Sequence, residues 1–150
     1  MRYAIKYDTI KPILEEEVSR EAAQAHSAEG VSLYDALKIT SRDEEKNKRL
    51  LVQVLAAIKE QCNRFICCAN FSGTPPVLTF DLDISSRRTI GREEIINTLL
   101  QDVTVNAFLS KYFLSKNAAD LSTKYGEQAA ADMQALNKVL YTKMPPKACF

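Results

Sequence analysis

The chain has 150 residues, of which 46% are hydrophobic and 26% are charged, with only 4 glycines. This composition excludes a disordered chain and predicts one globular, mainly helical domain, 1–150, with its own core. Because 20 basic and 19 acidic side chains leave a net charge of +1, no global electrostatic attraction to nucleic acid or to a membrane surface is expected.

The N-terminal residues predict a short strand followed by a helix. Residues 3–7 alternate crudely between apolar and polar side chains, which is typical of a strand. A helix should then begin at Asp8 or Thr9 and run to about Ala25. Its apolar stripe consists of Ile10, Ile13, Leu14 and Val18. The run Glu15–Glu17 is expected on its solvated face.

A long central helix is predicted over residues 41–68. Ser41 and Glu44 have the spacing of a capping box, and acidic residues follow where the helix dipole is positive. Apolar residues recur with helical spacing at Leu51, Val54, Leu55, Ile58, Cys62, Phe65 and Ile66. At ~1.5 Å per residue, such a helix would be roughly 40 Å long.

Residues 70–76 are a break rich in Gly and Pro, and a strand over 77–84 follows it. Leu78, Phe80, Leu82 and Ile84 share one face of this strand, whereas Asp81 lies on the opposite, wet face. A strand needs a hydrogen-bonded neighbour. Residues 3–7 could supply it, and so could another subunit.

Arg87, Arg88 and Arg92 form a small basic cluster in the polar loop after this strand. The cluster is either a solvated loop or a contact with a phosphate group or a partner, since guanidinium groups match phosphate and carboxylate. An apolar strand edge also recruits other chains. The candidate subunit or partner contacts are therefore Leu78, Phe80, Asp81, Leu82, Ile84, Arg87, Arg88 and Arg92.

Two helices should close the domain, over 92–116 and 120–143, with 144–150 as a loose tail. The fold class expected is mainly all-α: a small helical bundle of about four helices with one or two short β-strands. No run of about 18 apolar residues is present, and the N-terminus lacks the apolar core of a signal peptide, so we expect a cytoplasmic protein with no membrane contact.

No residue pattern indicates a chemical site. Cys62, Cys67, Cys68 and Cys149 lack the spacing of zinc ligands, and His26 is the only histidine. Glycine-rich phosphate-binding motifs are also missing. We therefore expect no catalytic residues, no metal, no cofactor and no enzymatic activity.

The order of elements resembles that of phage head–tail connector (adaptor) proteins of the DNA-packaging kind. The resemblance covers residues 31–143. It rests on the acidic, capped helix start at Thr40–Glu45, the loop and strand over 71–84, and two closing helices. The first of these helices is rich in aromatic residues at Phe108–Phe113.

That resemblance implies a non-catalytic structural protein of a phage or prophage. It implies a homo-oligomer that assembles as a ring between the portal and the tail, and that resides in the host cytoplasm or the virion. The alternative is a helical adaptor or regulatory interaction protein of unrelated function.

Overall fold

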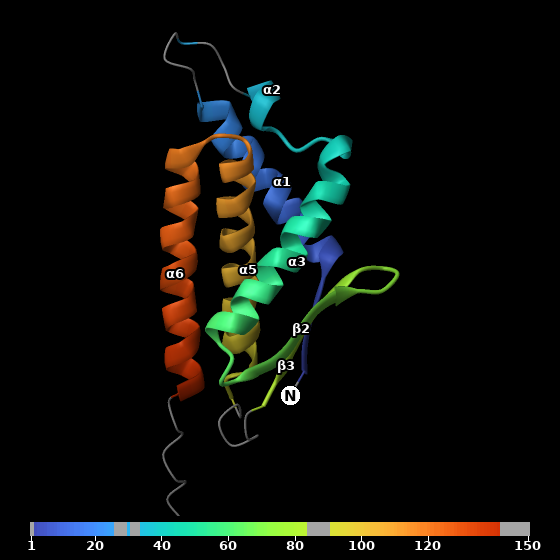
Figure 1. Cartoon of the computed structure of the whole chain (residues 1–150), viewed down its shortest axis with the longest axis vertical. Coiled ribbons are helices and arrows are strands. Elements are labelled where there is room, and N and C mark those ends of the chain that lie inside the picture. Colours follow the sequence, from blue (N-terminus) through green and yellow to red (C-terminus); the bar gives the residue numbers. More distant parts are fainter. Residues whose placement is uncertain (1, 26–29, 31–33, 84–90, 142–150) are drawn as a thin grey trace, which may run out of the picture.

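The computed structural model describes residues 2–25, 30, 34–83 and 91–141. Within these residues the chain forms four long helices and one small antiparallel sheet of three strands (Figure 1). The mainly helical class with a few short strands, predicted from the sequence, is therefore confirmed.

The chain begins with β1 (Arg2–Lys6), which leads directly into α1 (Tyr7–Gln24). Tyr3 and Ile5 alternate inward from β1 and are buried. The helix buries the predicted stripe at Ile10, Leu14 and Val18, while Ile13 is only half-buried. Both predicted elements are thus present, with boundaries shifted by about one residue.

A short helix α2 (Tyr34–Leu37) and a 3₁₀ turn (Ser41–Asp43) precede α3 (Glu44–Gln61). The predicted pairing of Ser41 with Glu44 is wrong, because the cap lies one residue earlier. The carboxylate of Asp43 accepts hydrogen bonds from the backbone N–H of Thr40 at 3.0 Å and from its hydroxyl at 3.2 Å. The acidic residues still lie in the first turn of α3, where they complement the helix dipole.

The prediction of one helix over 41–68 is also wrong. α3 ends at Gln61, so its 18 residues span roughly 27 Å. The backbone N–H groups of Phe65 and Ile66 both donate to the carbonyl oxygen of Cys62 at 2.9 Å, which closes a turn. The chain then continues as β2 (Ile66–Ser72). The backbone N–H and C=O groups of β2 form hydrogen bonds with a neighbouring strand instead of continuing the hydrogen bonds of the helix.

The predicted strand is β3 (Val77–Leu82), and it occupies the centre of the sheet in the order β1-β3-β2. β1 pairs with it antiparallel, with Tyr3 opposite Phe80. β2 pairs with its other edge, with Asn70 opposite Thr79, so β2 and β3 form a hairpin. The first of the two partners anticipated for this strand is confirmed, and β2 is a second intrachain partner that was not anticipated.

The two closing helices are α5 (Glu93–Ser115) and α6 (Ala119–Tyr141), which run antiparallel beside each other (Figure 1). Their starts agree with the prediction within one residue. The turn between them has Asn117 in the left-handed region, with φ of 60°. The N–H of Ala118 donates to the carbonyl oxygen of Phe113 at 2.8 Å and closes the end of α5.

One hydrophobic core joins the sheet to α1, α3, α5 and α6. Its largest fully buried side chains include Phe80 from β3 and Phe108, Tyr112 and Phe113 from α5. α3 runs diagonally across α5 in Figure 1 rather than alongside it, so the predicted bundle arrangement is not confirmed. In the described part of the chain, no helix combines the length and apolarity that crossing a membrane requires.

Candidate functional site

Three of the four apolar residues predicted to contact a partner lie in the core of the chain itself. Leu78 and Phe80 have no exposed surface, and Leu82 is 2% exposed. The contact prediction assumed an unpaired strand edge, and this premise is wrong because both edges of β3 are hydrogen-bonded within the chain. These three side chains therefore pack the core and leave no apolar ladder on the surface.

Of the polar residues of the predicted contact surface, the structure describes Asp81 and Arg92. Asp81 lies on the wet face of β3, as predicted, and accepts a hydrogen bond of 2.7 Å from Nε of Arg2 on β1. Arg92 precedes α5 and donates to the carbonyl oxygen of Val139 on α6 at 3.3 Å. Ile84, Arg87 and Arg88 lie outside the described residues. Whether these residues meet a partner stays a prediction.

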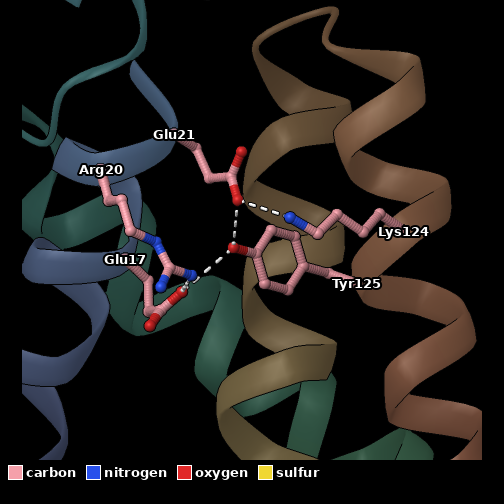
Figure 2. A network of polar contacts seen from close by, with 5 residues as sticks. All are labelled: Glu17, Arg20, Glu21, Lys124 and Tyr125. Carbon is pink, nitrogen blue, oxygen red and sulfur yellow. Dashed lines mark hydrogen bonds and ion pairs between the residues drawn. The ribbon is translucent and has the colours of Figure 1, made fainter. Parts of the chain in front are cut away.

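The structure instead brings five polar side chains together between α1 and α6 (Figure 2). The hydroxyl of Tyr125 lies 3.0 Å from Oε1 of Glu21 and 3.1 Å from Oε2 of Glu17. Nζ of Lys124 lies 2.7 Å from the same oxygen of Glu21, and the guanidinium of Arg20 pairs with Glu17. Two acids, two bases and one hydroxyl thus link the first helix to the last.

Helical spacing explains why these residues meet. Glu17 and Glu21 are four positions apart, so they lie on one face of α1. Tyr125 faces them from α6, with its ring stacked on Phe113 at a centroid distance of 5.5 Å. Its ring therefore belongs to the apolar core, while its hydroxyl reaches the polar network.

The pKa values of Tyr125 and Glu21 are both shifted in this network. Burial, then the hydrogen bond to Glu21, raise the pKa of Tyr125 well above its usual range. Burial alone would also raise the pKa of Glu21. Hydrogen bonds from Lys124 and Tyr125 outweigh that effect, and the pKa of Glu21 is lowered. The hydroxyl stays protonated and donates to one carboxylate at a time.

A hollow of about 360 Å³ lies beside the network, between α1, α5 and α6. Glu17, Arg20, Lys124 and Tyr125 line it, together with Asp102 of α5. Burial, followed by the negative charge of Asp132, raises the pKa of Asp102. A surface that carries both signs of charge can form ion pairs with polar groups of a partner, and such pairs set orientation more than affinity.

The cysteines take different environments. Cys62 is 2% exposed, and its Sγ contacts Sδ of Met133 at 3.2 Å, so it packs as a small core residue. Cys67 is exposed and its thiol donates to the carbonyl oxygen of Asp81 at 3.1 Å, whereas Cys68 is half-buried. Cys149 lies outside the described residues. Among the residues that the structure describes, no group of three or more His, Cys, Asp or Glu side chains is placed to hold a metal ion.

The sequence predicted that Glu17 lies on a solvated helix face, and the contact between Glu17 and Tyr125 was not predicted. One signal was available: Glu17 lies three positions before Arg20 and four positions before Glu21, and both spacings bring side chains together on a helix surface. Its partner could not be found, because Tyr125 lies 104 positions from Glu21.

Compared with known proteins, the chain matches no family model, no curated protein and no solved structure. The resemblance to phage head–tail connectors, drawn from the order of elements, therefore stays a prediction. A functional assignment must rest on the residues and surfaces described above.

Proposed function

We propose that the chain is a non-catalytic structural protein that self-associates into a ring between the portal and the tail of a phage. The element order over 31–143 is the sequence basis for this proposal. The structural observation that carries it is the β2–β3 hairpin, whose turn stands clear of the helices in Figure 1. Ser72, Gly73, Thr74 and Pro75 in this turn are all exposed.

A projecting turn on a firmly anchored base suits contact with a neighbouring subunit. The base is anchored because Leu78 and Phe80 of β3 are fully buried. In a ring, each subunit presents one surface to the next and receives a different surface from the previous one. The hairpin turn is our candidate for the presented surface. The mixed-charge hollow near Arg20 and Lys124 is our candidate for the receiving one.

The oligomeric state tests the proposal directly. Light scattering coupled to size-exclusion chromatography, over a range of protein concentrations, should give a large oligomer of defined mass. Thr74→Arg should shift the protein toward the monomer, because a long charged side chain at the turn would disturb a subunit contact. Thr98→Arg provides the matched control, since Thr98 is exposed on α5 and the turn stands clear of the helices (Figure 1).

A protein that stays monomeric at every concentration would overturn self-assembly. Gene neighbourhood supplies an independent test of the phage assignment: flanking portal, capsid and tail genes support it, and flanking metabolic genes contradict it. A stable one-to-one complex with an unrelated protein, with no self-association, would favour the alternative of a helical adaptor.

A further inference from the structure

Two adjacent cysteines lie at an irregularity in the pairing of β2 with β3. Ile66 of β2 lies opposite Leu82 of β3. Cys68, two positions further along β2, lies opposite Asp81, which is only one position from Leu82. β2 therefore contains one extra residue, Cys67, and two residues opposite one define a β-bulge.

The bulge places both thiols on the same face of the sheet. Ile66 is 1% exposed, and Ala69, three positions later, also packs against the core. In a regular strand, residues three positions apart face opposite sides, so the extra residue between them restores the inward direction. Cys67 is exposed and Cys68 is half-buried. Two neighbouring side chains that a regular strand would separate thus share the wet face, where a ligand can reach them.

The two sulfur atoms make polar contacts at this face. The thiol of Cys67 donates to the backbone carbonyl oxygen of Asp81 at 3.1 Å. The side-chain amide of Asn70 donates to Sγ of Cys68 at 2.9 Å. Sγ of Cys68 is therefore an acceptor, which is the role that a thiolate takes. Hydrogen bonds of this kind orient the side chains that bind a metal ion.

A guanidinium group lies close to the pair. Nε of Arg2 donates to Oδ1 of Asp81 at 2.7 Å. The pKa of Arg2 is raised first by this hydrogen bond and by the charge of Asp81, and to a smaller degree by negative charge at Cys68. The positive charge of Arg2 can therefore offset part of the negative charge of thiolates at this position.

A pair of thiolates favours an ion that needs only two ligands. In the described part of the chain, no three His, Cys, Asp or Glu side chains are placed to share a metal ion. Structural zinc sites have four ligands, so this pair does not form one. Thiolate ligands select Cu(I), which is stable with two thiolates alone. The zinc-ligand spacing that led us to expect no metal does not describe such a two-coordinate site.

We propose that Cys67 and Cys68 bind one Cu(I) ion through their two sulfur atoms. Each thiol releases one proton on binding, so the complex of one Cu(I) with two thiolates carries a single negative charge. The amide of Asn70 stays bonded to the sulfur of Cys68, and Arg2 offsets the added charge. The site does not depend on the proposed ring assembly.

Titration with Cu(I) tests the site. The full chain, reduced and kept free of oxygen, is titrated in competition with the Cu(I) chelator bathocuproine disulfonate. Cys149→Ser is the background, because Cys149 lies outside the described residues, and it should bind one ion per chain. In this background, Cys67→Ser and Cys68→Ser should each weaken binding by at least about 100-fold, because two linked ligands no longer act together. X-ray absorption should show two sulfur ligands on the copper.

Further variants separate binding from folding. Cys67→Ser should fold normally, because Cys67 is exposed and a serine hydroxyl can donate the same hydrogen bond. Asn70→Ala should keep one ion per chain and should bind it about tenfold more weakly, because a hydrogen bond to a ligating sulfur is lost. Ser72→Ala, at another exposed position of β2, is the matched control and should bind as the background does.

Three results would overturn the proposal. Binding of unchanged strength in either Cys67→Ser or Cys68→Ser would show that the two thiols do not act as a pair. One ion for every two chains would show a bridge between chains instead of a site within one chain. Equal binding by the background and by the double variant, in which both cysteines are replaced, would leave two surface thiols without a metal ion.

Discussion

The hydroxyl of Tyr112 on α5 donates a hydrogen bond of 2.7 Å to the backbone carbonyl oxygen of Leu37 on α2. Tyr112 is fully buried and Leu37 is 4% exposed, so water does not replace this bond if it is lost. Tyr112→Phe should therefore lower the free energy of unfolding by about 1–3 kcal/mol. Urea denaturation measures the loss. Tyr141→Phe is the control. Because Tyr141 is 51% exposed, this substitution should change the free energy of unfolding by less than about 0.5 kcal/mol.

Leu100 and Ile95 lie on opposite faces of α5. Leu100 has no exposed surface, whereas Ile95 is 51% exposed. Leu100→Ala leaves a cavity in the core and should lower the free energy of unfolding by about 2–5 kcal/mol. Ile95→Ala should change it by less than about 0.5 kcal/mol. Similar losses for the two variants, measured by thermal and urea unfolding, would contradict this orientation of α5.

The sequence predicted the elements whose signal is local. Period-two alternation located β3, and helical spacing located α1, α5 and α6. The sequence did not predict β2. Cys62, Phe65 and Ile66 continue the helical spacing of the apolar residues of α3, so a longer helix was predicted there. The choice between helix and strand there depends on pairing with β3, in which Asn70 lies opposite Thr79. This pairing joins two segments of the chain, so the apolar spacing within residues 62–66 alone does not indicate it.

The candidate sites were less predictable than the fold. The polar network needs α1 and α6 to approach each other, and no spacing within one helix indicates this. Asn47 is a buried polar residue that the sequence also indicated: it lies four positions before Leu51, on the apolar stripe of α3. A polar residue at a core position of a helix often needs a partner for its amide group.

Glu21 should make the free energy of unfolding depend on pH in the acidic range. Its pKa in the folded protein is lowered from 4.5, so its contribution is present above that value and is lost as the pH falls through the folded pKa. We expect Glu21→Gln to be destabilising at about pH 7 and to lose less stability than wild type on moving to about pH 3. Urea unfolding at the two pH values measures this difference. Glu16→Gln, at an exposed position of α1, should keep the acid dependence of wild type.

The thiol of Cys62 should react only when the chain opens. Burial raises its pKa, and the thiolate is the reactive form. In a variant with Cys67, Cys68 and Cys149 replaced by Ser, labelling of Cys62 by a disulfide reagent should be at least about 100-fold slower than labelling of an unfolded chain. A variant that retains only Cys67, which is exposed, should react rapidly. The triple variant should also keep the melting temperature of wild type under reducing conditions, because the three replaced cysteines are expected to be structurally inert. Stoichiometric zinc that is present in the wild-type protein and absent from the triple variant would contradict this expectation.

At Gly126, α6 lies close to Ser110 of α5. A Cβ atom at this position would lie 3.1 Å from Oγ of Ser110, which donates a hydrogen bond of 2.8 Å to the carbonyl oxygen of Ser122. In the interior of a helix, alanine is more favourable than glycine by about 1 kcal/mol. In Gly126→Ala this gain is opposed by crowding against Ser110, so we expect little stabilisation or a net loss.

The Ser110→Ala background separates the two effects. Without the hydroxyl, the new methyl group has room, and Gly126→Ala should raise the free energy of unfolding by close to the full helix preference. A double-mutant cycle should therefore give a coupling energy of about 0.5–3 kcal/mol between positions 110 and 126. Additive effects, measured by urea unfolding of the four proteins, would show that the two helices have room to accommodate a side chain, and the close approach at Gly126 would be wrong.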